Sequence, residues 1–317
     1  MPTNFPSGVA SYGMPVFPTT FPFINAQSVV AAVGAGQSIK GSTNVYFVSS
    51  VLGADGNPGN KMSSGGPFAT FKNALTAVSP GDTIVLLPGH VETMIAAGTV
   101  NCNVANIVVV GLGVGAVRPT FKYSTSTAAT FDIVKDNITF VNVRWDMTGI
   151  AALVVGINVK TAANDVTFES CEFVQASASI ACATAIVTDA NANNLKINNC
   201  RFTITGAGTA VTNALKVVGG DGLQVTNSFF EAGYATGSGA IQSVTTACTN
   251  AHILGNTVNN LTAACTKAMI FHASSTGVIS KNSLQILSGT APITGAAMSW
   301  VGPNYYAATI ATGSTIV

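Results

Sequence analysis

The chain has 317 residues, of which only 8% are charged, and 13 Lys and Arg against 12 Asp and Glu give a formal net charge of +1. This balance excludes a protein that binds nucleic acid by neutralising phosphates, because such binding needs a basic stripe. The hydrophobic fraction of 48% excludes charge-driven disorder, and the 32 glycines with many other small residues favour stacked β-structure over amphipathic helices.

The sequence shows no targeting or membrane segment. The first charged residue is Lys40, so the basic region of a secretory signal is missing, and no run approaches the roughly 18 apolar residues of a membrane helix. The six cysteines show no CxxC spacing, which argues against a zinc site and favours reduced, packed thiols. We therefore expect a soluble protein made in the cytoplasm, with no cofactor, metal, nucleic-acid or membrane partner.

Residues 1–40 are expected to form an extended amino-terminal arm. The segment before Lys40 has no charged side chain and is rich in Pro and Phe, without the period of a strand or a helix. Such a segment cannot fold alone or dissolve well, so it must dock on a surface. A strap along the rest of its own chain and a contact with another protein both fit, and the second is favoured. The contact residues are expected to be Phe5, Pro6, Tyr12, Pro15, Phe17, Phe21 and Phe23.

Residues 41–82 are expected to form a module that ends in a short capping helix. A strand and a turn rich in Gly and Asp, over residues 49–59, precede a helical pattern over residues 67–78. One face of that helix would carry Phe68, Phe71, Leu75 and Val78. This apolar face suits a helix that covers the open end of a β-structure, whose strand edges would otherwise pair with other chains.

A block of about 28 residues recurs from residue 83 to residue 302. It consists of a turn, a short apolar strand, Asn, a small residue and, two residues later, an aromatic residue. Positions 142, 170, 199, 227, 256 and 282 follow one another at steps of 28, 29, 28, 29 and 26 residues. A second strand series shares the period, at Ile157, Ile186, Leu215, Ile241, Met269 and Met298. Two strands per period predict a solenoid whose coils stack at about 4.8 Å.

Two columns of equivalent side chains support the solenoid. An Asn ladder is expected at Asn142, Asn199, Asn227, Asn256 and Asn282, with Ser170 as its one substitution. Stacked amides can bond the copies above and below them and tolerate turn conformations. An aromatic column is expected at Trp145, Phe173, Phe202 and Phe230. Alternation along the strand places these residues on the inner face of the coil, which favours packing in the core over stacking against a sugar.

This pattern resembles the right-handed, single-stranded parallel β-helix proteins of the pectate-lyase-like class. The resemblance covers residues 83–302 by repeat and residues 49–84 by motif. It implies an all-β fold, a parallel β-helix with a short amino-terminal capping helix and an extended arm, followed by a tail over residues 303–317. Residues 4–16 resemble the start of small structural proteins from the head modules of tailed phages.

Enzymes of this class attack polysaccharides with a carboxylate pair, or with Ca²⁺-binding acids and a basic residue. Asp146 and Glu231 are expected at the same strand position but three coils apart, which is too far for a glycosidase pair. Glu172 is expected between Arg144 and Arg201 on adjacent coils, where it stays ionised and is a poor general acid. Asp146 and Glu172 are the one close acid pair that the pattern predicts. No catalytic residue is assigned, and no enzymatic activity is expected.

The histidines add no candidate for catalysis. No carboxylate or serine stands at a spacing that links it to any of them, so all three are expected to be structural: His90, His252 and His272.

These observations predict a non-enzymatic structural protein of a phage virion, namely a capsid decoration or cement protein on the outer capsid surface. The arm would dock on the major capsid protein. A homotrimer is expected, because capsid lattices offer local three-fold positions and, by resemblance, viral β-helices commonly associate in this way. The alternative is a tail spike or fibre that binds or cleaves a host surface polysaccharide. A secreted bacterial lyase ranks lower, since the secretory signal is missing.

Overall fold

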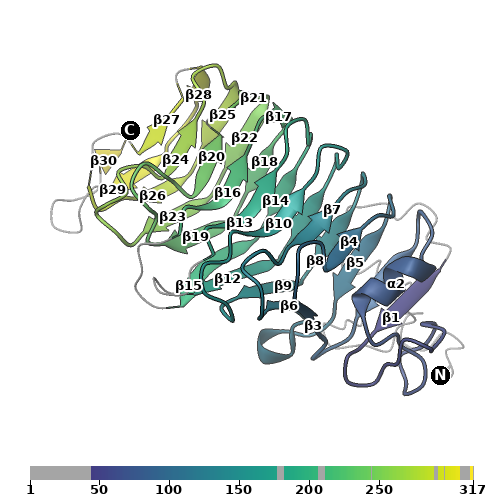
Figure 1. The fold of residues 1–317 in the computed structure, drawn as a ribbon. Helices are drawn as coiled ribbons and strands as arrows, with labels where there is room; N and C mark the ends of the chain where they lie inside the picture. Colours follow the sequence, from purple (N-terminus) through teal and green to yellow (C-terminus); the bar gives the residue numbers. More distant parts are fainter. Residues whose placement is uncertain are drawn as a thin grey trace, which may run out of the picture.

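The chain folds into a parallel β-helix (Figure 1). The computed structural model describes residues 44–176, 182–205, 211–243, 245–288, 292–295, 297–307 and 315–316. Three sheets, which we call A, B and C, run along the solenoid axis, and each coil passes through them in that order. The pairing of named strands is parallel throughout this part, except between the last two strands of sheet B. The all-β solenoid that the repeat predicts is confirmed.

The elements follow the order of the coils. Sheet A consists of β1 (Val45–Val48), β2 (Thr83–Leu86), β5 (Val108–Gly111), β8 (Thr139–Val141), β11 (Thr167–Glu169), β14 (Lys196–Asn198), β18 (Gln224–Thr226), β22 (Ala251–Leu254), β25 (Gly277–Ser280) and β28 (Met298–Trp300). Sheet B consists of β3 (Val91–Met94), β6 (Thr120–Tyr123), β9 (Arg144–Met147), β12 (Glu172–Ala176), β15 (Arg201–Thr205), β19 (Phe229–Ala232), β23 (Thr257–Asn260), β26 (Ser283–Gln285), β29 (Tyr305–Ala307) and β30 (Thr315–Ile316).

Sheet C and the short elements complete the described part. Sheet C consists of β4 (Val100–Cys102), β7 (Phe131–Ile133), β10 (Val155–Val159), β13 (Thr184–Thr188), β16 (Asn213–Val217), β20 (Ile241–Ser243), β24 (Met269–Phe271) and β27 (Ile293–Thr294). A small pair is formed by β17 (Gly220–Asp221) and β21 (Cys248–Thr249), and the helices are α2 (Phe71–Ala77) and the 3-10 turn η2 (Gly115–Val117). Over the described ranges, no helix has the length and apolar character needed to cross a bilayer.

Each full coil has three strands, not the two that the sequence pattern predicts. The aromatic column belongs to a strand of its own, in sheet B, because a residue with a left-handed backbone ends the strand of sheet A and redirects the chain. After Asn142, for example, β9 begins only two residues later. The second series is correct as far as Met269, which pairs with Ile293 of β27, whereas Met298 lies in sheet A.

The Asn ladder is correct for its first three members and one residue out of phase for the last two. Asn142, Asn199 and Asn227 occupy the corner between sheets A and B with φ of 56°, 51° and 51°. The register places Gly255 and Lys281 at the same corner, with φ of 67° and 58°. Asn256 and Asn282 therefore follow the corner, because other residue types fill the left-handed position in those coils.

The position after the corner forms a buried column that changes from thiol to amide along the axis. Its members are Cys171, Cys200, Ser228, Asn256, Asn282 and Asn304, all at most 3% exposed. Each side-chain acceptor from Ser228 onward receives the backbone N–H of the equivalent residue one coil earlier, at 2.9 to 3.1 Å. This buried column thus satisfies polar groups inside the solenoid that burial would otherwise leave unpaired.

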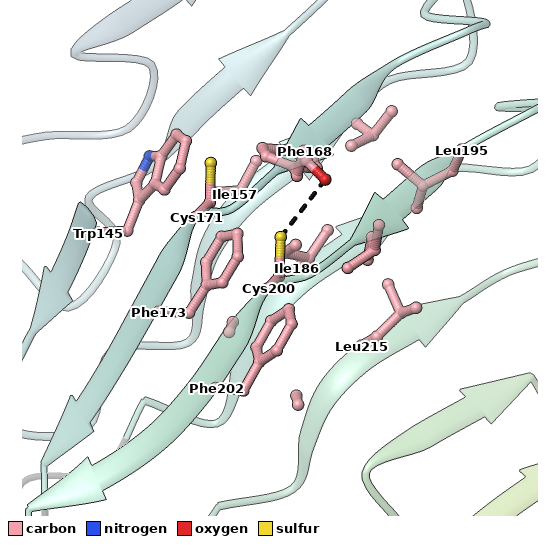
Figure 2. Close-up of a cluster of buried hydrophobic side chains, with 14 of the residues drawn as sticks. Trp145, Ile157, Phe168, Cys171, Phe173, Ile186, Leu195, Cys200, Phe202 and Leu215 are labelled. Atoms are coloured by element: carbon pink, nitrogen blue, oxygen red, sulfur yellow. Dashed lines mark hydrogen bonds between the residues drawn. The ribbon is translucent and has the colours of Figure 1, made fainter. Parts of the chain in front are cut away.

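The aromatic column fills the core, as its inward parity predicts (Figure 2). Trp145, Phe173, Phe202 and Phe230 stack with centroid separations of 5.1, 4.3 and 4.7 Å and interplanar angles of 6°, 9° and 12°. Phe121 begins the column one coil earlier. Stacks of this kind add to the free energy of burial, so the column stabilises neighbouring coils in the same register.

The amino-terminal end of the solenoid is closed by α2 and the loop before it. Phe71 is fully buried and Phe68, Leu75 and Val78 are at most 8% exposed, so the expected apolar face is confirmed. Thr70 caps the helix by accepting the backbone N–H of Asn73. The outer edge of β1 bonds to Gly59 and Phe68, which leaves the backbone of that strand paired on both sides.

Candidate functional site

The residues expected to bind a partner lie outside the described residues. These are Phe5, Pro6, Tyr12, Pro15, Phe17, Phe21 and Phe23, and their role stays a prediction. Within the described ranges, the candidate site is a hollow of about 290 Å³ on the outer surface, at the corner between sheets A and B. Its lining residues are Arg118, Ser170, Cys171, Glu172, Asn199, Cys200, Arg201, Asn227 and Phe229.

The hollow is built by the first outward position of the sheet B strands. Because side chains alternate along a strand, the residue before each core aromatic residue faces out. This rule places Arg144, Glu172, Arg201 and Phe229 in one outward column, and the register confirms that they are neighbours in this order. Asn199 and Asn227, at the exposed corner, form the rim beside them.

Glu172 is the centre of an ion network in the hollow. Arg144 donates from Nε to the Glu172 carboxylate at 2.8 Å, and its terminal nitrogen contacts the same oxygen at 2.8 Å. Arg118 contacts the other carboxylate oxygen at 3.1 Å. The expected neighbours of Glu172 are therefore correct in register, but its second ion-pair partner is Arg118 rather than Arg201. Two guanidinium groups thus hold the Glu172 carboxylate, one at each oxygen.

Arg201 has a different role from the one expected. Its guanidinium carbon lies 4.7 Å from the centroid of the Phe229 ring, on the next coil. Among the described residues, no carboxylate lies within ion-pair distance of it. Stacking on the ring holds the guanidinium plane in place and leaves its N–H groups for another acceptor.

Sequence reasoning missed Arg118 and Phe229. Arg118 follows η2 in a corner much longer than the two-residue corner before β9, so the repeat gives no register for it. Phe229 had a visible signal, because it precedes the core residue Phe230 and must face the opposite side of the strand.

Two further acids face outward from the strands of sheet B, Asp146 and Glu231. Asp146 and Glu231 share a strand position three coils apart, about 14 Å at the usual strand spacing, as expected. Asp146 accepts from Thr148, whereas Glu231 accepts from Asn259. Asp146 and Glu172 lie on neighbouring strands, two positions apart in register. In the part of the chain that the structure covers, no group of His, Cys, Asp and Glu could hold a metal ion.

His90 has a carboxylate neighbour, which the sequence analysis did not expect. Its Nε2 lies 3.5 Å from Glu92, and its Nδ1 accepts the backbone N–H of Ser50 at 3.0 Å. Glu92 in turn accepts the backbone N–H groups of Phe71 and Lys72 in the first turn of α2. The imidazole is fully buried, so this arrangement ties a loop to the capping helix and is not an open site.

The cysteines are unpaired thiols, as their spacing suggested. Cys171 and Cys200 occupy equivalent positions on adjacent coils, and Cys200 donates from Sγ to the backbone oxygen of Phe168 at 3.4 Å (Figure 2). All six side chains are buried. Burial raises the pKa of the Cys200 thiol well above its ordinary value, which suits a packed thiol and not a nucleophile.

Known proteins match this chain in three-dimensional structure but not in sequence. No family model matches the chain, and no curated protein sequence matches it. Among solved structures, a GH136 lacto-N-biosidase from Eubacterium ramulus matches at 12% identity and a TM-score of 0.49, over 79% of this chain and 57% of that protein. The chain thus spans little more than half the length of that enzyme.

Two further solved structures match the chain. ORF18 of Geobacillus virus E2 matches at 14% identity and a TM-score of 0.43, over 92% of this chain and 65% of that protein. Pectate lyase Pel9A matches at 13% identity and a TM-score of 0.37, over 84% of this chain and 80% of that protein. The parallel β-helix that the resemblance implies is confirmed by the strand order and register of the three sheets.

The comparisons correct the prediction that the chain is not an enzyme. Two of the three proteins, the lacto-N-biosidase and the pectate lyase, are enzymes. The scarcity and spacing of the acids predict the absence of catalysis, and these two enzymes contradict that prediction. The exclusion of enzymatic activity is withdrawn.

Proposed function

We propose that the chain is a structural component of a tailed-phage virion, held on the outer capsid surface by its arm, residues 1–40. The observation that carries the proposal is the closed amino-terminal end of the solenoid. Because α2 covers the first coil and Gly59 and Phe68 pair with β1, the described core needs no further segment to complete it. The arm, which is rich in Phe and Pro and has no charged side chain before Lys40, is then available to bury its apolar side chains in a partner.

The partner in this proposal is the major capsid protein, and the assembly is a homotrimer at a local three-fold position. Several Phe and Pro side chains in a groove could supply most of an interface of standard size. The flank of the solenoid would then face outward, with its polar corner columns exposed to solvent.

Deletion of residues 1–40 tests this proposal. The shortened protein should keep its circular dichroism spectrum and melting transition but lose co-sedimentation with undecorated capsids. Phe17→Asp should weaken co-sedimentation strongly, because a charge in a desolvated pocket costs more than lost contact area. Gln37→Glu, which adds the same charge at a polar position of the arm, is the matched control. Full binding of the shortened protein would show that another surface attaches the chain to the capsid. Unfolding of the shortened protein would show that the arm is a strap that stabilises its own chain.

A tail spike or fibre that binds or cleaves a host surface polysaccharide is the second candidate. It is favoured by the outward column that combines Arg201 with the aromatic ring of Phe229. Electron microscopy of particles carrying the labelled protein distinguishes the two candidates, because label over the head supports the first and label on the tail supports the second.

A further inference from the structure

The last strand of sheet A, β28, lies at the end of the solenoid opposite to α2 and has an open edge (Figure 1). It pairs with β25 on one side, and no described strand pairs with its other side. Val301 donates to Ile279 on the inner side, so the backbone N–H and C=O of Trp300, one residue earlier, face the open edge. The outer edge of β1, by contrast, bonds to Gly59 and Phe68. The two ends of sheet A therefore differ in whether their backbone is paired.

The apolar core is also incompletely covered at this end. Trp300 pairs in register with Ile279, which is fully buried, so its indole belongs to the inward column of sheet A. It is nevertheless 41% exposed, because no described strand follows β28 in that sheet. Asn304, the last described member of the buried column, accepts the backbone N–H of Asn282, but no described residue accepts its own backbone N–H. A half-exposed ring and unpaired backbone groups thus form one surface, which a further strand would cover.

No charged side chain protects this edge. Exposed edge strands in other proteins commonly carry Lys or another charge that prevents pairing with a second chain. From residue 282 to residue 317, no side chain is charged. Two such ends therefore approach each other without electrostatic repulsion, and burial of Trp300 and of Val301, which is 55% exposed, favours their contact.

The chain itself shows which kind of segment such an edge accepts. β29, the last parallel strand of sheet B, pairs in the antiparallel direction with β30, an uncharged segment of the same chain. β28 is equally uncharged, and the described residues provide no such partner for it. A two-fold axis would bring two copies of β28 together in the antiparallel direction, so that each copy offers the other the same surface.

We propose that two copies of this chain associate end to end, by antiparallel pairing of β28 with β28 of the second copy. Ser299 is the central residue of the strand and faces outward, so the two Ser299 side chains lie opposite each other. The N–H of Trp300 then donates to the C=O of Met298 in the second copy, and each indole is covered. The contact is small, so we expect an affinity in the micromolar range. It leaves the arm and the flanks of the solenoid free.

Sedimentation velocity of the full chain, from nanomolar to high micromolar concentration, tests the proposal. We expect the sedimenting mass to double as the concentration rises, whether the smallest species is one copy or a trimer. Ser299→Lys should weaken this association at least about tenfold, because two ammonium groups would lie opposite each other. Ser283→Lys is the matched control, since it adds the same charge at an exposed serine of β26, which pairs with a strand on both sides. Circular dichroism checks that both variants fold.

Two further variants test the two-fold register. Ser299→Glu alone should associate as weakly as Ser299→Lys, whereas an equimolar mixture of the two should recover the association, because opposite charges then lie across the contact. Ser299→Cys should form a disulfide between two copies under mild oxidation, because opposite residues of an antiparallel pair bring their Cβ atoms within disulfide range. Ser283→Cys should not, and the six native cysteines are buried.

Equal association of Ser299→Lys and Ser283→Lys would overturn the proposal. So would a mixture that associates no better than either variant alone, or no association at hundreds of micromolar. Hydrogen exchange at the Trp300 amide should be fast in dilute protein and slow after association. Slow exchange in dilute protein would also overturn the proposal, because residues 303–317 would then cover the edge in place of a second copy. None of these measurements involves a capsid, so this contact and the attachment through the arm can fail separately.

Discussion

The left-handed corner between sheets A and B determines which residue types each coil accepts there. Asn tolerates positive φ because its short amide can bond locally, and Asn142 donates to the backbone oxygens of Gly111 and Gly113. Gly255 fills the corner without a Cβ, and Lys281 is strained there at φ of 58°. The buried residue that follows the corner is under a separate constraint, because its polar groups have no access to water.

Replacing Asn282 by Leu should lower the free energy of unfolding by about 2 to 3 kcal/mol. The amide of Asn282 donates to Ile253 and Asn304 and accepts from Asn256, and all of these groups are buried. Leucine would remove these bonds and would leave the buried backbone N–H of Asn256 without its acceptor. Urea unfolding of Asn227→Gly is the control, because that residue is exposed and glycine accepts its φ of 51°. Similar losses in the two variants would contradict the register of the buried ladder.

At the scale of elements, α2 depends on contacts from outside the helix. It has seven residues, too few for a stable isolated helix, and neither acidic residues in its first turn nor basic residues in its last turn support it. The missing support comes from Asp55, which accepts the backbone N–H groups of Ala69 and Thr70, and from Glu92 in β3. The cap of the solenoid is thus connected to the strand that begins sheet B.

Replacing Glu92 by Gln should loosen α2 and lower the free energy of unfolding by about 1 to 2 kcal/mol, because charged acceptors at a helix start bond more strongly than an amide. Hydrogen exchange should show faster exchange of the backbone amides of residues 71–77. Glu231→Gln is the control, since its carboxylate bonds to the side chain of Asn259 on the outer surface. Unchanged exchange in α2 would mean that Glu92 does not hold the helix.

At the scale of the whole molecule, stacked coils distribute buried thiols along most of the axis, from Cys102 to Cys265. Burial raises the pKa of Cys182 to about 12 and that of Cys248 to about 11, from an ordinary value of 9.0. Burial also raises the pKa of Tyr123 and Tyr234 in the core. In the unfolded chain these groups lose their protons at lower pH than in the folded chain.

The free energy of unfolding should therefore be steady near neutral pH and fall once the pH exceeds about 9, where unfolded thiols ionise and folded ones do not. Each such thiol contributes a slope of up to about 1.4 kcal/mol per pH unit until its folded pKa is reached. Cys248→Ser should give a shallower decline between pH 9 and 11 than the wild type. The free energy of unfolding of both proteins is measured by urea unfolding at each pH. Equal slopes against pH would show that folding does not raise the pKa of the Cys248 thiol.

Sequence alone predicts the solenoid because its period, its turn residues and its inward aromatic residues all depend on local spacing. The phase of the last coils could not be predicted, since Gly255 and Lys281 fill a corner that Asn fills earlier and a neighbouring Asn mimics the ladder. The hollow could be predicted only in part. Strand parity places Glu172 and Arg201 outside, but whether Arg201 pairs with Glu172 or stacks on Phe229 depends on side-chain torsions that no spacing records.

The fluorescence of the two tryptophans reports on two different parts of the solenoid. Trp145 lies fully inside the aromatic stack, whereas Trp300, in the last strand of sheet A, is 41% exposed. Fluorescence from an indole inside a stack of rings is shielded from water and from soluble quenchers, and that from a partly exposed indole is not. Iodide should therefore quench the emission of Trp300 selectively, and loss of the carboxyl-terminal coils can be followed separately from loss of the central core.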